Sequence, residues 1–308
     1  MIKVSTSNSQ IHYVEQFIEY LSKVRNLSEN TLRSYQTDLM AFEQWCNREG
    51  IEVTQIDHRG LRLYLAYLKQ ARYSAKTLNR HLSALRGFYK WMQRERLISS
   101  DPALALSNPR SPRNLPHTMT DSDVNRLLES CDVSTTVGLR DRAFLEFLYA
   151  TGARISEVAT LKLEQLDLSH GVVRLFGKGS KERIVPLYES AVVWLKKYLQ
   201  SSRPTLLLKD KTGRTHSALF ISVRGNNMSA DSLRKVFSSY VIAAGLDSSL
   251  SPHAMRHTYA TELLGGGADL RIVQELLGHE SLSTTQVYTH LSVDRLKEAA
   301  KAAHPRSE

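Results

Sequence analysis

The sequence predicts a mainly helical protein with one small β-sheet or hairpin, divided into two domains. Three observations lead to this fold class. Apolar residues recur at the spacing of amphipathic helices along most of the 308 residues. Residues 171–187 instead show the pattern of two short strands around a glycine-rich turn. Residues 99–118 hold four of the eight prolines and separate two segments that are each long enough to bury a core.

Residues 1–98 are expected to form a small helical domain. Apolar residues at helical spacing mark a first helix over residues 11–21 and a second over residues 32–42. Asp57 and Ser74 are suitable N-cap residues for a third and a fourth helix, each followed by a leucine-rich stripe.

The second half of this domain carries a strong excess of positive charge. Residues 59–96 contain ten Lys and Arg against the single acid Glu95, so their balance is 10 − 1 = +9, in a chain of net charge +10. A solvated helix surface normally mixes both signs, so the segment predicts a contact with a phosphate backbone, with Lys76 and Arg80 as candidate DNA-binding residues. The alternative is a basic face without function. The chain's pI near 9.6 also favours a polyanionic partner.

Residues 99–118 are expected to be an extended linker, and residues 119–308 to form the second domain. Two basic domains joined by such a linker predict a clamp around a DNA duplex. Along the second domain we expect a helix starting at Thr120 with Asp123, a buried helix over Leu139–Tyr149, the hairpin at 171–187, extended structure over Leu206–Phe220 and a helix over Ser232–Ile242.

Two motifs in the second domain combine an arginine or lysine with a helix start or a tight turn. Arg154 and Glu157 are three residues apart at the head of a helix, where backbone N–H groups favour an anion and Glu157 can orient a buried guanidinium. An ordinary surface ion pair is the alternative. Lys178 lies at the glycine-flanked tip of the hairpin, where it can enter a DNA groove. The tip is not a nucleotide-binding P-loop, because the second glycine and the Ser or Thr after the lysine are missing.

Residues 251–290 hold His253, Arg256, His279 and Tyr288 at spacings that indicate a single phosphate site. His253 and Arg256 are three apart, so in a helix they share one face. Arginine can clamp a phosphate through two hydrogen bonds and histidine can donate one, while a tyrosine held beside cations is a legitimate nucleophile. Taken singly, Tyr288 or either histidine would more often be an ordinary packing residue, and it is the combined spacing that favours the phosphate site.

The same stretch predicts how these residues are brought near one another. The glycines at 265–267 end the helix of His253, and residues 272–277 form a second amphipathic helix that stops at Gly278. His279 follows that stop directly. A short third helix capped by Ser or Thr would then carry Tyr288.

Other chemistry is not expected from the sequence. His253 and His257 have the spacing of paired metal ligands, but the cation of Arg256 between them would repel a divalent ion, so no metal is expected. Cys46 and Cys131 match no ligand or disulfide pattern, and we expect core residues in a reducing cytoplasm. The absence of an apolar run of about 18 residues predicts no membrane segment.

Four motifs in a fixed order carry a resemblance to a known family. TGARISE, GKGSKER, SPHAMRHTYAT and LLGHESLSTTQVYTH follow a helical first domain and a linker. This combination resembles the tyrosine site-specific recombinases, and most closely the bacterial Xer type. The resemblance covers nearly the whole chain and implies an N-terminal core-binding domain and a C-terminal catalytic domain that form a C-shaped clamp on DNA.

The resemblance also implies a role for each candidate residue. Tyr288 would attack the scissile phosphate and form a 3′-phosphotyrosine, and Lys178 would be the general acid for the leaving 5′-oxygen. The phosphate would be held by Arg154, Arg256, His253 and His279. Neither a metal nor ATP nor another cofactor is implied, because the protein–DNA ester conserves the energy of the broken bond.

The implied partners are a double-stranded DNA recombination site and three further protomers. The tetramer would be formed by this chain alone or with a second Xer recombinase, and a division-associated DNA translocase is a further expected partner. The implied role is the resolution of chromosome dimers at cell division, in the cytoplasm at the nucleoid. The alternatives are a mobile-element integrase, an enzyme like a type IB topoisomerase, and a non-catalytic basic DNA-binding protein.

Overall fold

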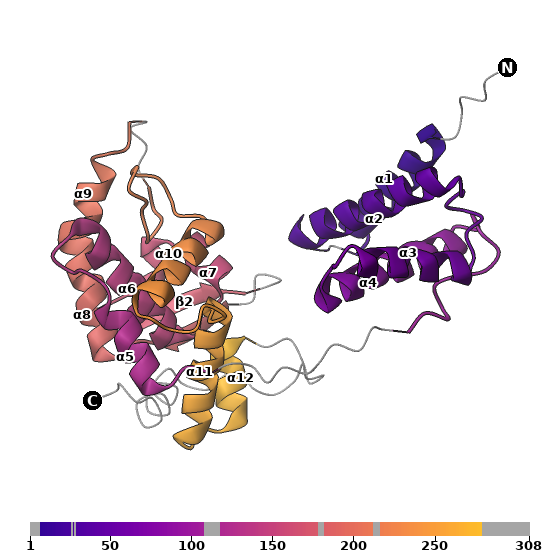
Figure 1. Cartoon of the computed structure of the whole chain (residues 1–308). Helices are drawn as coiled ribbons and strands as arrows, with labels where there is room; N and C mark the ends of the chain where they lie inside the picture. Colours follow the sequence, from indigo (N-terminus) through magenta and orange to yellow (C-terminus); the bar gives the residue numbers. More distant parts are fainter. Residues whose placement is uncertain are drawn as a thin grey trace. The chain divides into compact units, whose positions relative to one another are not determined.

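The computed structural model divides the chain into two compact units, Met1–Asn114 and Leu115–Glu308. Each unit has a hydrophobic core of its own. Figure 1 follows the chain from its N-terminal helices to the end of the last described helix. The structure describes residues 7–25, 27, 29–107, 118–177, 182–211 and 216–278.

The described residues of the N-terminal unit form four helices, as the sequence predicts. They are α1 (Ser7–Lys23), α2 (Glu29–Glu49), α3 (His58–Gln70) and α4 (Ala75–Arg94). The predicted caps are confirmed: Asp57 accepts a hydrogen bond from the backbone N–H of Gly60 at 2.8 Å, and Ser74 accepts one from Thr77 at 3.2 Å. Aromatic rings from α2, α3 and α4 fill the core, with Phe42 and Tyr64 edge to face at 5.0 Å.

The core of this unit extends past the helices. Ala103 and Leu106, in the segment expected to be linker, are buried in it. Arg86 on α4 also donates a hydrogen bond to the carbonyl of Leu106. The N-terminal unit therefore continues beyond residue 98, because two apolar side chains after its last helix are buried in its core.

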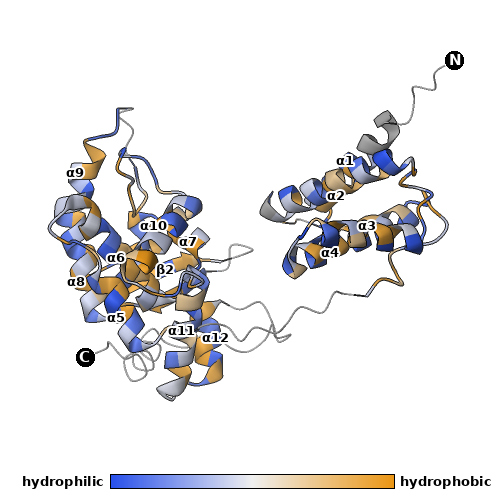
Figure 2. Ribbon diagram, viewed as in Figure 1, coloured by the Kyte–Doolittle hydropathy of each residue, from blue (hydrophilic) through white to orange (hydrophobic). Residues whose placement is uncertain are grey.

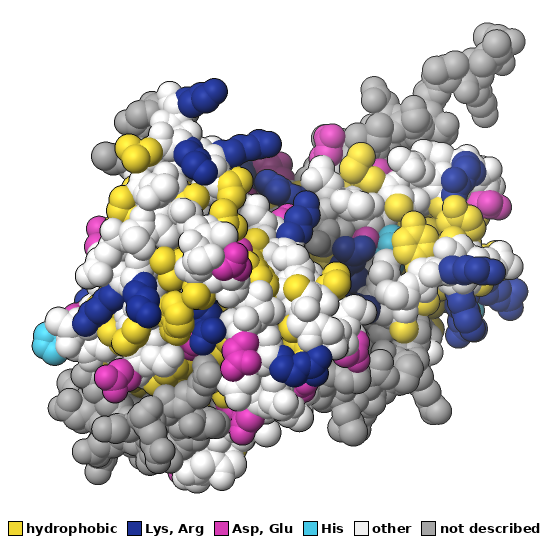
Figure 3. Space-filling model, turned by 60° about the vertical axis from the view of Figure 1, so that its left-hand side comes forward, with side chains coloured by type: hydrophobic (Ala, Val, Ile, Leu, Met, Phe, Trp, Pro, Cys, Tyr) yellow, Lys and Arg dark blue, Asp and Glu magenta, His cyan; other side chains and the backbone are white. Residues whose placement is uncertain are grey.

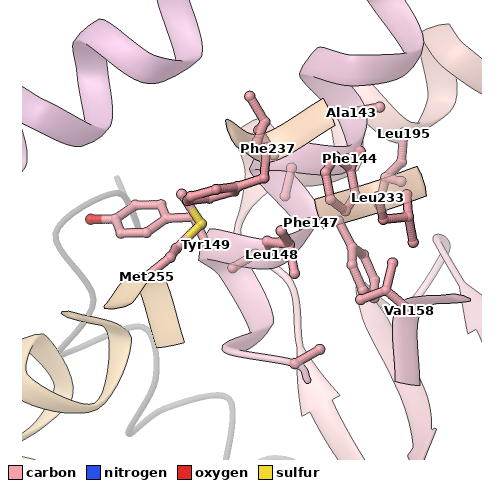
Figure 4. Close-up of a cluster of buried hydrophobic side chains, with 14 of the residues drawn as sticks. Ala143, Phe144, Phe147, Leu148, Tyr149, Val158, Leu195, Leu233, Phe237 and Met255 are labelled. Atoms are coloured by element: carbon pink, nitrogen blue, oxygen red, sulfur yellow. The ribbon is translucent and has the colours of Figure 1, made fainter. Parts of the chain in front are cut away.

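The C-terminal unit is mainly helical and surrounds one buried helix. Its helices are α5 (Asp121–Glu129), α6 (Thr136–Thr151), α7 (Ile155–Thr160), α8 (Glu189–Lys197), α9 (Arg203–Leu207), α10 (Ala230–Ala243), α11 (Pro252–Gly265) and α12 (Leu270–Leu277), with a short 3₁₀ helix at Leu163–Gln165 and a π-helical stretch at Tyr198–Ser202. The ribbon of α6 is hydrophobic over much of its length (Figure 2), and its side chains meet those of α7, α8, α10 and α11 (Figure 4). α6 is thus the centre on which the other helices pack.

A three-stranded antiparallel sheet completes this unit and contains the predicted hairpin. Its strands, in the order β1–β2–β3, are Leu166–Asp167, Val172–Phe176 and Glu182–Pro186. Val173 pairs with Val185 and Leu175 with Arg183, and all four side chains are buried. Because side chains alternate along a strand, Arg183 shares the core face of β3 with Val185.

The expectation of extended structure over Leu206–Phe220 is wrong at its start. Leu206 and Leu207 end helix α9, and the described extended contact in this region is an isolated bridge between Lys162 and Ala218. The run of leucines after Pro204 is compatible with a strand or with a helix. In the structure it is helical, and Leu206 is buried in the core. The predicted helices around Leu139–Tyr149 and Ser232–Ile242 are confirmed as α6 and α10.

Candidate active site

Glu157 lies at the start of α7 and joins that start to an arginine. Its Oε2 accepts a hydrogen bond of 2.8 Å from the backbone N–H of Arg154, and its Oε1 accepts one of 3.0 Å from Arg154 Nη1. Arg154 is the N-cap residue of α7. Its backbone N–H, one of the groups expected to bind an external anion, therefore donates to the Glu157 carboxylate instead. The pair leaves 34% of the Arg154 side chain exposed, so the guanidinium is held but still reachable from solvent.

A second arginine, Arg183 on β3, binds the same carboxylate. Its Nη1 donates to Glu157 Oε1 at 2.9 Å and its Nη2 donates to Oε2 at 2.7 Å, which is the bidentate geometry of a strong ion pair. Burial by itself would raise the pKa of Glu157, but the hydrogen bonds and charges of Arg183 and Arg154 outweigh it and hold that pKa below its ordinary value. Glu157 is therefore a carboxylate at neutral pH and ties two guanidinium groups together.

A third arginine, Arg256, reaches the same place from α11. Its side chain is buried, and its Nη1 donates to the carbonyl of Gly152 at 2.5 Å while its Nη2 donates to the carbonyl of Leu277. Burial first, and then the positive charge of Arg154, lower the pKa of Arg256 to about 10. Arg256 stays protonated at neutral pH, so the site keeps its positive charge.

The three arginines converge on the last turn of α12. The carbonyls of Leu276, Leu277 and Gly278 accept hydrogen bonds, in this order, from Arg183 at 2.7 Å, from Arg256, and from Arg154 at 3.0 Å. The last carbonyls of a helix have no partner within it and carry partial negative charge, so they attract cations. The site gathers three guanidinium groups around one carboxylate and suits an anion such as a phosphate diester.

Gly152 lets the chain enter this site between α6 and α7. It is the C-cap of α6 and has a left-handed backbone with φ 53°. A Cβ at this position would lie 2.5 Å from Cδ1 of the buried Tyr259 ring, so only glycine fits there. The carbonyl that binds Arg256 and the backbone of Arg154 are positioned by this turn.

The structure brings together only part of the predicted site. Arg154, Glu157 and Arg256 meet at the end of α12, and His253 is exposed on the first turn of α11. Lys178, His279 and Tyr288 lie outside the described residues, although His279 directly follows Gly278 in the sequence.

Arg183 is a functional candidate that the sequence reasoning missed. The sequence does contain a signal for it. Arg183 lies two residues before Val185 in a strand, so both side chains are on the same face, which is the face toward the core. A charged residue at such a position needs a buried partner. The sequence does not show that this partner is Glu157, which lies 26 residues away.

Lys76 and Arg80, the DNA-binding candidates, lie on the exposed part of α4 in the N-terminal unit. Lys and Arg side chains stand out in several places on the face shown in Figure 3. Arg80 also has an internal partner, because its Nη2 lies 2.9 Å from Oδ1 of the buried Asp38. Oδ1 of Asp38 lies 3.2 Å from His81 Nε2, and His81 Nδ1 lies 3.1 Å from the hydroxyl of Tyr64.

Burial shifts the pKa of two groups in this chain of polar contacts, Asp38 and His81. Burial raises the pKa of Asp38 to about 6, although the charge of Arg80 opposes it. Burial lowers the pKa of His81 to about 4, so its ring is neutral at physiological pH. The Arg80 guanidinium is therefore close enough to compensate Asp38, while 43% of its side chain stays exposed to solvent.

Among the described residues, no three His, Cys, Asp or Glu side chains are grouped so that they could hold a metal ion. None of the helices in the described part of the chain is long and apolar enough to cross a membrane.

Comparison with known proteins identifies the class to which this fold and site belong. The model of the phage integrase family matches residues 117–295, and that of the phage integrase N-terminal SAM-like domain matches residues 14–96. The chain belongs to the phage integrase family.

Its relatives narrow the assignment to the Xer-type tyrosine recombinases, which are DNA strand-transferring enzymes. Tyrosine recombinase XerD of Yersinia pestis is 43% identical over 295 residues, 96% of this chain and 97% of the relative. Tyrosine recombinase XerC of Pelotomaculum thermopropionicum is 41% identical over 302 residues, 96% of this chain and 99% of the relative. The fold is similar to that of the XerH site-specific recombinase bound to a palindromic difH substrate, with a TM-score of 0.74 at 23% identity over 97% of this chain and 98% of that one.

Proposed function

We propose that this recombinase cuts and rejoins DNA at a specific site through a 3′-phosphotyrosine formed by Tyr288. In this mechanism Arg154 and Arg256 stabilise the negative charge that develops on the scissile phosphate, and His253 and His279 donate hydrogen bonds to its oxygens. Lys178 protonates the 5′-oxygen as it leaves, and the 5′-hydroxyl of another strand later attacks the phosphotyrosine. The reaction needs neither metal nor ATP, because one phosphodiester is exchanged for another.

The observation that carries the proposal is the meeting of Arg154 and Arg256 on consecutive carbonyls at the end of α12. Their hydrogen bonds to Gly278 and Leu277 place two guanidinium groups beside each other, although the residues are far apart in the sequence. A positively charged pair of this kind is what a phosphate with developing charge requires. The next residue in the chain is His279, one of the two proposed histidine donors.

The test is a denaturing gel that detects protein covalently attached to DNA. Wild-type protein and Tyr288→Phe are incubated in EDTA with nicked duplexes that carry candidate sites from the host chromosome terminus, where the nick traps the cleaved intermediate. We expect a metal-independent adduct with the wild type and none with the variant. An adduct that persists in Tyr288→Phe would refute the assignment of the nucleophile. Tight DNA binding without any adduct would favour a DNA-binding function instead.

The biological role proposed is the resolution of chromosome dimers at cell division. Relatives named XerC and XerD, 41% and 41–43% identical over nearly the whole chain, support an Xer role over that of a mobile-element integrase. Four protomers would assemble on two DNA sites, as this chain alone or with a second Xer recombinase, in concert with a DNA translocase. Recombination of a two-site plasmid by the pure protein, compared with the protein plus the host's second recombinase, distinguishes the two assemblies.

A further inference from the structure

Arg183, like Arg154, contacts both Glu157 and the end of α12. It lies on β3, five residues after Lys178 in the sequence. Its two Nη atoms bind the two oxygens of Glu157, and its Nε donates to the carbonyl of Leu276 at 2.7 Å. A single guanidinium thus links the hairpin to the carboxylate that holds Arg154 and to the helix that precedes His279.

The packing around Arg183 leaves it little freedom. Its side chain is 6% exposed, and the chain turns past it at Gly278, which has φ 64°. A Cβ on Gly278 would lie 3.2 Å from Arg183 Nη1 and 3.3 Å from its Cδ. The backbone that leaves α12 therefore lies directly against the Arg183 side chain.

We propose that Arg183 is a positioning residue for DNA cleavage, which holds Glu157 and the end of α12 in the geometry that aims Arg154 at the scissile phosphate. The inference rests on the proposed function of Arg154. Arg183 itself is covered by the protein, with only 6% of its side chain exposed. Its effect on the reaction passes through Glu157, whose Oε1 accepts hydrogen bonds from both Arg154 and Arg183.

The planar fork of arginine is needed for this role. Three N–H groups point in fixed directions, two to the carboxylate and one to the helix carbonyl, and the point charge of a lysine cannot make all three bonds. Arg203 offers a matched control in the same unit. It is also buried, and its hydrogen bonds to described residues go to the backbone carbonyls of His216, Ala218 and Leu219, not to Glu157.

The first test compares Arg183→Lys with Arg203→Lys in the full-length protein. The nicked duplex on which wild-type protein forms its adduct is the probe, and single-turnover cleavage, DNA affinity and melting temperature are measured. We expect Arg183→Lys to cleave on the order of 10-fold to 100-fold more slowly at unchanged DNA affinity, because small misplacements of a catalytic group are that costly. Arg203→Lys should lower the melting temperature to a similar degree and leave cleavage near the wild-type rate.

A double-mutant cycle identifies the route of the effect. If Arg183 acts through Arg154, Arg183→Lys should cause little further loss of rate in an Arg154→Ala background, whereas independent effects would multiply. A fully multiplicative loss would overturn the proposal, and so would wild-type cleavage by Arg183→Lys. The cycle requires that every variant is soluble and still binds DNA. The affinity measurement establishes both.

The pH profile gives a readout that a merely structural role would not change. Glu157 is faced by Arg154 from its own helix, by Arg183 from β3 and by the charge of Arg256 from α11. Arg183 and Arg154 oppose the effect of burial on the pKa of Glu157. In Arg183→Met the pKa of Glu157 should rise, so the carboxylate is neutralised at a higher pH than in the wild type. The rate deficit of Arg183→Met should therefore grow as the pH is lowered from 8 towards 5.5.

The outcomes separate this proposal from the proposed function. If wild-type protein forms no adduct that depends on Tyr288, the proposed function fails and the role of Arg183 falls with it. If the wild type forms the adduct but Arg183→Met shows a deficit that is independent of pH and follows its melting temperature, only the positioning role is overturned.

Discussion

At the scale of single residues, the site is a balance of charge around Glu157. One carboxylate compensates three guanidinium groups only in part, which leaves the site positive, as a phosphate-binding site must be. Only Arg154 of the three arginines is more than slightly exposed, so Arg154 is the side chain best placed to meet DNA directly.

Arg154→Ala should reduce cleavage on the order of 10² to 10³, the usual effect of removing one donor to a transition state. The measurement is the single-turnover rate of adduct formation with saturating protein. Arg234→Ala is a suitable control, because Arg234 pairs with Asp231 three residues away on the surface, as Arg154 does with Glu157 in the site. Cleavage at the wild-type rate by Arg154→Ala would exclude Arg154 from the catalytic set.

Lys76→Ala and Arg80→Ala should differ although both residues lie on α4. Loss of exposed Lys76 should weaken DNA binding without changing the melting temperature. The slope of log K against log salt concentration should become shallower by about one, the contribution of one phosphate contact. Loss of Arg80 should also destabilise the N-terminal unit, by about 1 kcal/mol after allowance for solvent screening, because it leaves Asp38 buried without its cation. Equal melting temperatures for the two variants would contradict this difference.

Glu43 should make the N-terminal unit sensitive to pH. It is buried on α2, and its Oε1 has no hydrogen-bond partner among the described residues. Burial, and then the charge of Glu15, raise the pKa of Glu43 from 4.5 to about 7. Because the pKa of Glu43 is higher in the folded state, protonation of Glu43 adds to the free energy of unfolding. This contribution is fully present below about pH 4.5 and is lost as the pH rises through about 7.

Glu43→Gln should therefore be more stable than the wild type at pH 8, by roughly 1 to 3 kcal/mol, and have no advantage at pH 4.5. The melting temperature of the N-terminal unit in thermal scans at the two pH values is the measurement. A variant that is no more stable than the wild type at pH 8 would show that Glu43 ionises in the fold without cost.

At the scale of elements, the end of α12 is the structural centre of the catalytic unit. α12 contacts β3 and α11, and its last carbonyls bind side chains from β3, from α11 and from the start of α7. Each of these elements contributes an arginine, so a shift of any one of them would move the hydrogen-bonding groups of the others.

Two glycines test this arrangement because they share a left-handed backbone and differ in their neighbours. A Cβ on Gly278 would press on Arg183, whereas Gly267, with φ 87°, has nothing within 4 Å of that position. Gly278→Ala and Gly267→Ala should both cost roughly 1 kcal/mol of stability for the backbone. Only Gly278→Ala should also slow cleavage in the single-turnover assay, and equal cleavage by both would contradict the role of this turn.

At the scale of the whole molecule, the chain consists of two units with separate cores. The aromatic core of α1–α4 and the core around α6 have no residue in common. Each unit therefore buries its own apolar side chains, and the proposed clamp requires that both units hold the same DNA.

The isolated units 1–114 and 115–308 should each bind a recombination-site duplex far more weakly than the intact chain does. The reason is that linking two binding modules makes the second contact intramolecular. Affinity is measured by gel shift at fixed salt, with circular dichroism to establish that each unit is folded. A folded single unit that binds as tightly as the whole chain would refute the clamp.

Much of the fold follows from local patterns in the sequence. Asp57 and Ser74 predict the starts of their helices, because capping is a contact between residues three positions apart. Gly278 predicts the end of α12, because few other residues adopt its left-handed backbone conformation. The hairpin at 171–187 is likewise a local feature. The family could also be recognised, since its motifs are short and occur in a fixed order.

The tertiary structure alone decides which of these pieces meet. Arg183 pairs with Glu157 across 26 positions, and Ala103 and Leu106 join a core whose helices end before them. The run Leu206–Leu207 became helical because the core has a place for a helix there. The sequence by itself determined the elements and the chemical groups they carry, because those depend on near neighbours. Only folding decided their partners, because buried charges must be compensated by whatever group the packing brings within hydrogen-bonding distance.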